Sequence, residues 1–166
     1  MTIESLMSRQ VQHCRPDHTL DYAARLMWDH DCGCLPVCAA DGDGEPRVIG
    51  MLTDRDVCMA ALFEGRPLYE LKVADAMSRD ISVAKLDDRP EDVELLMREQ
   101  RIRRVPVTDD HGSVVGIVSL ADFARAAAAQ SSAAEAPDDA SVSERDVGHT
   151  LAAICEPGQR RINPPT

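Results

Sequence analysis

The nine residues Val48-Ile-Gly-Met-Leu-Thr-Asp-Arg-Asp56 decide the fold, because the chain contains a second version of them, Val114-Val-Gly-Ile-Val-Ser-Leu-Ala-Asp122. Both stretches begin as apolar runs, both reach a hydroxyl residue, and in both an Asp follows three positions later. The two copies are 66 residues apart. A repeat of this length indicates a duplicated structural unit.

The repeat extends toward the N-terminus with a slightly different spacing. Met7-Ser8 recurs as Met77-Ser78, and Leu35-Pro-Val37 recurs as Val105-Pro-Val107, both at an offset of 70. The first copy therefore carries four extra residues, which fall in its turn-rich stretch 41–46. Because surface loops tolerate insertions and cores do not, each copy is predicted to be one folding unit.

Length and charge narrow the class of protein. The 166 residues suffice for one ordinary domain, but each half is marginal alone, so we expect the copies to pack on each other. A net charge of −11 without a long basic run excludes nucleic acid as a partner. No stretch approaches the roughly 18 apolar residues of a membrane span, and residues 1–10 lack a secretory signal. We therefore expect a cytoplasmic protein, with no membrane partner, whose cysteines are reduced thiols.

Apolar periodicity predicts the order strand, helix, strand, strand, helix in each copy. The first helix of copy one is expected to begin near Asp17-His-Thr19, and that of copy two at Pro90, which suits a first turn. The later strands are expected at 34–38 and 48–52 in copy one, and at 104–108 and 114–118 in copy two. The predicted fold class is α/β, with two repeats, 1–66 and 67–130, related by a pseudo-twofold axis.

The C-terminal part has a different composition. Residues 131–143 are rich in Ala, Ser and Asp and are predicted to be a linker. Residues 144–156 can form a short amphipathic helix with Val147, Leu151 and Ile154 on one side. We treat 131–166 as a separate segment. In copy one, Trp28 is expected to cover the end of the first helix.

Each hydroxyl-x-x-Asp motif at the start of a closing helix has two interpretations. Thr53 with Asp56, and Ser119 with Asp122, have the spacing of a capping box, in which the hydroxyl caps the helix and the acid reaches back. The same geometry also suits a nucleotide. A helix N-terminus attracts phosphate, and a carboxylate one turn later can accept both hydroxyls of a ribose. Gly50 would then allow a close approach of backbone or ligand.

Taken in order and twice over, these motifs resemble a tandem pair of cystathionine β-synthase (CBS) domains. The resemblance covers residues 5–129, and its marks are the Met-Ser opening, the Pro-Val strand, the Asp/Gly turn and the Gly-x-x-(Thr/Ser)-x-x-Asp junction. It implies a stand-alone regulatory module, not an enzyme, that binds an adenosine ligand in the cleft between the repeats. AMP, ADP and ATP are the common ligands in that family, while NAD and S-adenosylmethionine also occur, and no catalytic cofactor is implied.

The resemblance also implies the site residues. Asp56 and Asp122 would hold the ribose, and Thr53 and Ser119 would meet phosphate. The adenine would lie against the first strands, and the second strands would form the opposite wall. The residues assigned to these walls are Val11 to His13, Ile81 to Val83, Leu35 with Pro36, and Val105 with Pro106.

The two sites are expected to differ in charge. Copy two carries Arg101, Arg103 and Arg104 where copy one has Asp31, Gly33 and Cys34. Since arginine is a good phosphate partner, we favour the Asp122 site with Arg103 or Arg104 near phosphate. The alternative is that these arginines form an ordinary solvated surface. Arg55 can serve the first site in part.

Two further interpretations remain open. Cys32, Cys34 and Cys38, near His30, suggest a thiol or metal sensor, although four well-spaced ligands are missing and no metal is assigned. The chain can also be a dimerising scaffold that binds no ligand. In each case we expect a homodimer formed through helix faces. A ligand would act by shifting the population between settings of the two repeats, or of the C-terminal segment 144–156, with an effector protein as a further partner.

Overall fold

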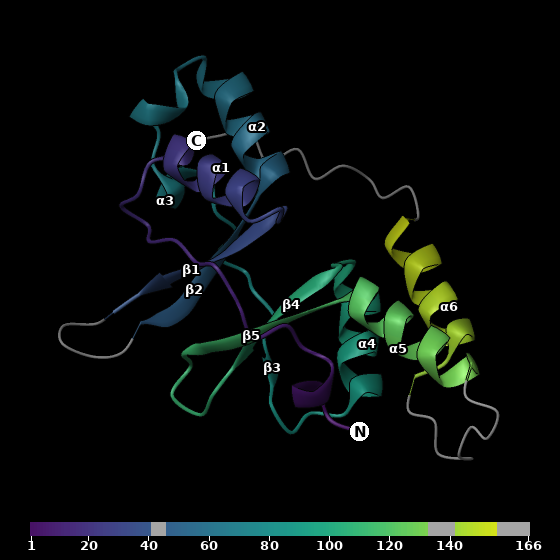
Figure 1. The fold of residues 1–166 in the computed structure, drawn as a ribbon. Helices are drawn as coiled ribbons and strands as arrows, with labels where there is room; N and C mark the ends of the chain where they lie inside the picture. The colour runs from purple at the N-terminus through teal and green to yellow at the C-terminus, as the bar shows by residue number, and fades with distance from the viewer. Residues whose placement is uncertain (41–45, 133–141, 156–166) are drawn as a thin grey trace.

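The computed structural model describes residues 1–40, 46–132 and 142–155, and these form two similar halves with a helix added at the C-terminal side (Figure 1). The first half contains α1 (Leu20–Asp29), β1 (Cys34–Ala39), β2 (Arg47–Thr53) and α2 (Asp54–Glu64). The short helix α3 (Val73–Ala76) connects it to β3 (Ala84–Lys85), α4 (Pro90–Gln100), β4 (Arg104–Thr108), β5 (Val114–Ser119) and α5 (Leu120–Ser132). The last element is α6 (Glu144–Cys155).

The two hairpins have the same register. Cys34 lies opposite Thr53 in the β1–β2 pair, and Arg104 lies opposite Ser119 in the β4–β5 pair. Both ladders also shift at the same place, after Val37 and after Val107. The predicted duplicated α/β fold is therefore confirmed, and the two sequence offsets identify equivalent residues.

The first strand of each repeat is shorter than expected. In copy one a single residue, Cys14, bridges to Val37, whereas in copy two Ala84–Lys85 pair with Val107 and Thr108 in a parallel ladder. Pro16 occupies the position that Leu86 has in copy two, and proline has no N–H to donate to a ladder. The residues expected to wall the ligand, 11–13 and 81–83, therefore precede the strands.

The halves are joined by an exchange of their opening segments. Ser8 pairs with Ile117 of copy two, with N–O distances of 2.9 and 3.0 Å in the two directions. The equivalent Ser78 pairs with Met51 of copy one at 2.9 and 3.0 Å. Each Met-Ser opening thus lies along the last strand of the other repeat, so neither repeat completes its sheet alone.

This exchange explains the two repeated glycines. A Cβ atom on Gly50 would lie 2.8 Å from the carbonyl oxygen of Ser78 and 2.9 Å from Sδ of Met77. A Cβ atom on Gly116 would overlap Sδ of Met7. Such contacts are repulsive. Glycine is needed at position 50, where the contact is with backbone, whereas at position 116 a Cβ atom would displace the Met7 side chain.

Each half has its own apolar core. In copy one the side chains of Leu20, Leu35 and Leu52 are completely buried, and in copy two those of Val105, Val118 and Phe123 are. Pro90 begins α4 at the expected position, and Thr19 precedes α1. None of the helices in the described ranges is long and apolar enough to cross a membrane.

The expectation for Trp28 is wrong, because 86% of its surface is exposed. The end of α1 is closed instead by backbone bonds. The N–H of His30 donates to the carbonyl of Leu26, and the N–H of Cys32 donates to the carbonyl of Met27 at 2.9 Å. The indole is left at the surface.

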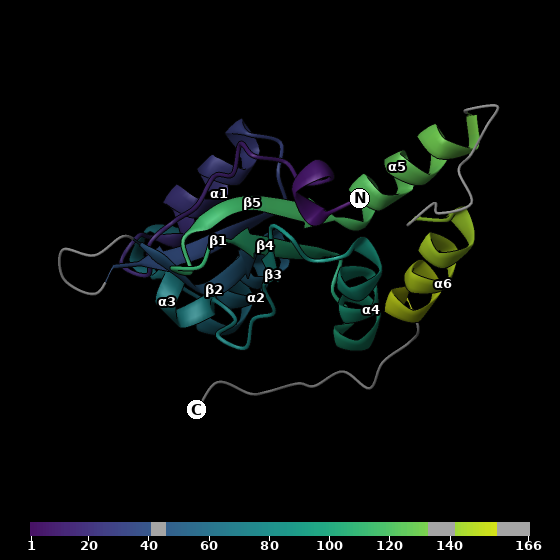
Figure 2. The same ribbon diagram turned by 90° about the horizontal axis from the view of Figure 1, so that it is seen from below.

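The C-terminal helix forms as predicted over residues 144–155, and Glu156 lies outside the described residues. In both views of the ribbon α6 lies beside α4 and α5 (Figures 1 and 2). Val147 and Ile154 pack on the core of copy two, but Leu151 is 46% exposed, so its expected burial is wrong. Thr150 takes the buried position instead, since it has a hydrogen-bonding partner on α4. In the linker, α5 continues to Ser132, and residues 133–141 lie outside the described ranges.

Replacing Gly50 by Ala is expected to lower the free energy of unfolding by about 1–3 kcal/mol, the usual cost of overpacking. The clash is with a backbone oxygen, which cannot move without breaking the Met51–Ser78 pair. Gly148→Ala is the control, because a Cβ atom there meets nothing within 4 Å. In a helix interior that change should add about 0.5–1 kcal/mol. Urea denaturation measures both, and an unchanged midpoint for Gly50→Ala would contradict the role given to the crossing.

Candidate functional site

The hydroxyl-x-x-Asp motif of copy one is a complete capping box at the start of α2. The carboxylate oxygen Oδ2 of Asp56 accepts hydrogen bonds from the backbone N–H of Thr53 at 2.9 Å and from its hydroxyl at 2.7 Å. In return the Thr53 hydroxyl accepts from the N–H of Asp56 at 3.2 Å. The capping interpretation of this motif is therefore confirmed.

In the motif of copy two the Asp carboxylate accepts the same two bonds and has a further partner. Oδ2 of Asp122 accepts from the backbone N–H of Ser119 at 2.7 Å and from its hydroxyl at 2.5 Å. The other oxygen, Oδ1, is paired with the guanidinium of Arg125, one turn further along α5. Asp122 is 8% exposed, whereas the side chain of Arg125 is 70% exposed. The backbone N–H and the hydroxyl of Ser119 therefore fix one oxygen of the Asp122 carboxylate, and the other oxygen faces the exposed guanidinium of Arg125.

A cavity of about 360 Å³ opens beside Asp122 and is walled by both repeats. Copy one contributes the opening segment that crosses to β5 and the turn between α1 and β1. Copy two contributes the start of β4, the end of β5 and the first turn of α5. The lining residues are Ser8, Gln10, Val11, Gln12, His30, Asp31, Cys32, Gly33, Cys34, Arg104, Ile117, Ser119, Asp122 and Arg125.

The cavity brings together five of the residues predicted to bind nucleotide, namely Val11, Gln12, Arg104, Ser119 and Asp122. Of the two arginines considered for phosphate, Arg104 lines this cavity and Arg103 does not. His13 is exposed and lies outside the lining. Arginine 104 comes from β4, whereas Val11 comes from the opening segment of the other repeat, so the site depends on the exchange described above.

The residues assigned to the opposite wall are buried in the two cores. Leu35 and Val105 have no exposed surface, and Pro36 and Pro106 are buried as well. They therefore support the strands behind the cavity and do not line it.

The residues assigned to the Asp56 site lie outside this cavity. Arg55 is exposed, as is Val83, at 40% of its surface. Ile81 follows Ser78, which pairs with Met51, so it stands to Thr53 and Asp56 as Val11 stands to Ser119 and Asp122. A ligand role for these residues of the first site stays a prediction.

Sequence reasoning missed Arg125 and Gln10, which line the cavity beside Gln12, a residue within the predicted range Val11 to His13. Arg125 had a readable signal, because it follows Asp122 by three positions on a helix and such residues are neighbours on the helix surface. Gln10 had none, since it lies in a segment without regular structure. Arg125 supplies a cation for an anionic group, and the two glutamines supply amides that both donate and accept hydrogen bonds.

The thiols near the site are poorly suited to redox sensing. Burial raises the pKa of Cys14 to about 12 and those of Cys34 and Cys38 to about 11. Burial also raises the pKa of Cys32, although the nearby Arg104 opposes this. The thiolate is the form that reacts with oxidants and binds metals. The raised pKa values of these cysteines therefore disfavour both thiol oxidation and metal binding. In the described ranges no three His, Cys, Asp or Glu side chains gather as metal ligands do.

The repeats match a known family at both of their positions. The family model of the CBS domain matches residues 3–62 and again residues 73–129. The chain belongs to the CBS-domain family. The resemblance seen in the sequence is confirmed, and so is the two-repeat α/β architecture. Outside the matched repeats, the described residues form only short connecting segments and α6, so they include no separate catalytic domain.

Similar proteins share the pair of repeats. The CBS domain-containing protein YhcV of Bacillus subtilis is 35% identical over 124 residues, which cover 74% of this chain and 83% of YhcV. The crystal structure of hypoxic response protein I with two coordinated zinc ions has a TM-score of 0.66 and 34% identity, over 75% of this chain and 98% of that chain.

A third similar protein was solved with adenosine compounds. The CBS domain pair of protein MJ0100, in complex with 5′-methylthioadenosine and S-adenosyl-L-methionine, has a TM-score of 0.63 and 26% identity. The match covers 75% of this chain and 94% of that chain. Proteins built from a CBS pair are regulatory modules, and this chain has the same organisation.

Treating the folded protein with iodoacetamide at about pH 8 should separate its cysteines into two groups. Cys58 and Cys155 are exposed and should react first, while the buried Cys14, Cys34 and Cys38 should stay unmodified until the chain unfolds. Mass spectrometry of peptides from timed samples measures each rate. Fast labelling of Cys34 in the native state would revive the thiol-sensor interpretation.

Proposed function

We propose that this chain is a regulatory module that binds an adenosine-containing ligand, of the AMP, ADP or ATP class, in the cavity beside Asp122. The observation that carries the proposal is the composition of the cavity wall. A carboxylate, a helix N-terminus and two arginines meet there on one side of an opening made by both repeats.

Each part of such a ligand has a partner in the lining. The ribose hydroxyls would donate to Oδ1 of Asp122, which now pairs with Arg125. Arg125 is an exposed side chain, so it can turn from the carboxylate to the phosphate. Arg104 would take the phosphate from the other side, with the forked geometry that suits arginine. The first turn of α5 adds N–H groups and a partial positive charge.

The base would lie against the opening segment of copy one. Val11 offers an apolar surface, and Gln10 and Gln12 offer amides for the polar edge of adenine. Support for the ligand class comes from the MJ0100 pair, which was solved with two adenosine compounds. S-Adenosylmethionine and NAD therefore remain alternatives within the same proposal.

Ligand binding would act on the arrangement of the two repeats. The cavity wall comes from both halves, so a bound ligand stabilises one relative setting of them over others. Helix α5 begins in the cavity, and α6 packs on α5. We propose that the setting of these two helices is what an effector protein reads.

We also propose that the protein forms a homodimer in the cytoplasm through exposed helix surfaces. Trp28 on α1 and Leu62 on α2 are 86% and 68% exposed. Large apolar side chains on a helical surface are commonly covered by a second subunit. For experiments on separate parts, we take 1–66 and 67–130 as the repeats and 131–166 as the C-terminal segment.

Isothermal titration of the purified chain with AMP, ADP, ATP, NAD and S-adenosylmethionine tests the ligand class. Binding should weaken by about tenfold to a hundredfold in Arg104→Gln, because a charge-assisted bond to phosphate is lost. Arg103→Gln is the matched control, since Arg103 is also exposed but does not line the cavity. No binding of any compound would favour the scaffold interpretation, and equal losses in both variants would remove Arg104 from the site.

A second pair of variants tests whether the ligand binds beside Asp122 or beside Asp56. Asp122→Asn keeps an oxygen that can cap α5 but removes the charge, so thermal stability should fall by no more than about 1 kcal/mol. Ligand affinity should fall much further. Asp56→Asn makes the same change in the capping box of α2, which lies outside the cavity. If Asp56→Asn abolishes binding and Asp122→Asn does not, the ligand belongs in the first site.

A further inference from the structure

The cavity beside Asp122 adjoins a second cavity, and Arg104 stands between the two. The second cavity has a volume of about 500 Å³ and lies between α1 and α2. The two linings share Asp31, Cys32, Gly33 and Arg104. With its ribose on Asp122 and its phosphate on Arg104, a nucleotide points toward the second cavity. Further phosphate groups would therefore extend into the part of the second cavity that is nearest to Arg104.

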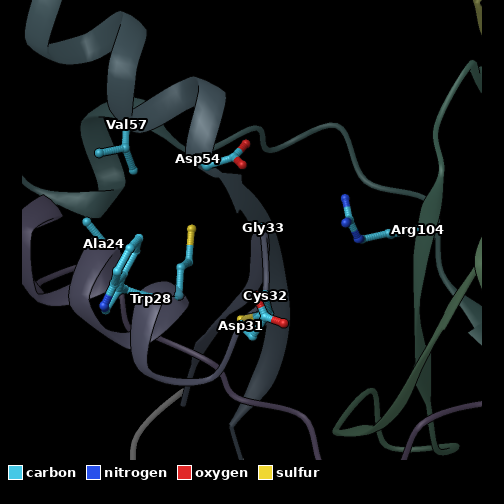
Figure 3. Close-up of a pocket in the computed structure, with 9 residues that line it drawn as sticks. Ala24, Trp28, Asp31, Cys32, Gly33, Asp54, Val57 and Arg104 are labelled. Carbon is cyan, nitrogen blue, oxygen red and sulfur yellow. The ribbon is translucent and has the colours of Figure 1, made fainter.

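An acidic side chain faces Arg104 at this point. Figure 3 shows the carboxylate of Asp54 and the guanidinium of Arg104 on either side of Gly33. A Cβ atom on Gly33 would lie 3.1 Å from Oδ2 of Asp54 and 3.7 Å from Nη2 of Arg104. The two charged groups are therefore less than about 7 Å apart, within the screening length of about 8 Å at physiological ionic strength. Asp54 lines the second cavity but not the cavity beside Asp122.

The charges of the two cavities suit one phosphate group better than several. Arg104 and Arg125 line the cavity beside Asp122, and a phosphate monoester carries about two negative charges near neutral pH. The two arginines balance these charges once the ribose has displaced Arg125 from Asp122. Among the described residues that line the second cavity, Asp31 and Asp54 are acidic and Arg104 is the one cation. Each further phosphate group would add negative charge beside two carboxylates.

The start of α2 does not offset this repulsion. A helix N-terminus ordinarily attracts phosphate through its free N–H groups. In α2, however, Oδ1 of Asp54 accepts from the N–H of Arg55 at 2.7 Å, and the N–H of Asp54 donates to the carbonyl of Gly33 at 3.2 Å. In copy two, Leu120 and Ala121 stand at the equivalent positions, and neither side chain can accept a hydrogen bond. The start of α5 can therefore receive a phosphate, whereas the start of α2 is occupied by its own carboxylate.

We propose that Asp54, together with Asp31, restricts the site beside Asp122 to ligands with a single phosphate group, so that it binds AMP in preference to ADP and ATP. ADP and ATP place their outer phosphates against these acids, and AMP does not, so the acids act against the longer ligands alone. This inference rests on the proposed function and names both the preferred nucleotide and the side chain that selects it.

Titration calorimetry of the full chain with AMP and with ATP measures the preference. EDTA is present in both titrations, so that no divalent cation neutralises the outer phosphates. The wild-type protein should bind AMP at least about tenfold more tightly than ATP, because like charges at this separation repel. In Asp54→Asn, whose amide oxygen can still accept from the N–H of Arg55, the two affinities should lie within about threefold of each other. Asp54→Lys should bind ATP more tightly than AMP.

Glu64→Gln is the matched control. Glu64 is exposed at the other end of α2, about 15 Å from Asp54 at the rise of an α-helix, and this variant loses the same negative charge. It should keep the wild-type ratio of AMP to ATP affinity. If Glu64→Gln narrows the ratio as much as Asp54→Asn does, net charge and not Asp54 sets the preference, and the proposal is wrong.

Salt separates repulsion from a lack of space. Raising NaCl from about 0.05 M to about 0.5 M screens exposed charges, so the preference of the wild-type protein for AMP should shrink. A preference that does not change with salt would mean that the outer phosphates are excluded by size, which contradicts the role given to the acids.

The same titrations distinguish this inference from the proposed function. If neither AMP nor ATP binds to the wild-type protein, the proposed function is wrong and the inference is wrong with it. If AMP and ATP bind with equal affinity, the proposed function stands, and the selection by Asp54 is overturned alone.

Discussion

The pairing of each Met-Ser segment with the last strand of the other repeat is the constraint on which the rest of the structure depends. Hydrogen bonds between Ser8 and Ile117, and between Ser78 and Met51, join the last strand of each hairpin to the other half by a one-residue antiparallel bridge. Gly50 and Gly116 leave the space that these crossings need. The cavity beside Asp122 follows from the same exchange, since Val11 extends the crossing segment toward the first turn of α5. A duplication without the exchange would have two cores but no shared site.

Much of the fold could be predicted from the sequence because each motif occurs in both copies of the repeat. The strands at 104–108 and 114–118 lie within one residue of their predicted bounds, and the start of α4 at Pro90 is at the predicted residue. The failures have local causes that a pattern does not reveal. Pro16 shortens the first strand of copy one, and backbone bonds close α1 and leave Trp28 at the surface. On α6 Thr150 is buried and Leu151 is exposed, because the polar link from Thr150 to Glu94 decides which side of the helix is buried.

The candidate site was predicted in part for similar reasons. Arg104, Ser119, Asp122 and Val11 come together as expected, since motif residues at strand ends keep their places in a repeat. Leu35 and Val105 were assigned to a wall but belong to the cores, because an apolar residue next to a site and one behind it look alike in sequence. At the surface, sequence differences between the two copies were more informative than their similarities. Where copy two has Glu94 and Arg98 for α6, copy one has Ala24 and Trp28. The two halves therefore keep one fold while presenting different surfaces.

The central claim is that the cavity shared by the two repeats is the ligand site. A crystal structure of the full chain grown with saturating AMP tests it most directly. The account predicts AMP beside Asp122, with its ribose on that carboxylate, its phosphate at Arg104 and Arg125, and its base against Val11. An empty cavity, or AMP bound only at a place that the residues of one repeat form alone, would contradict it.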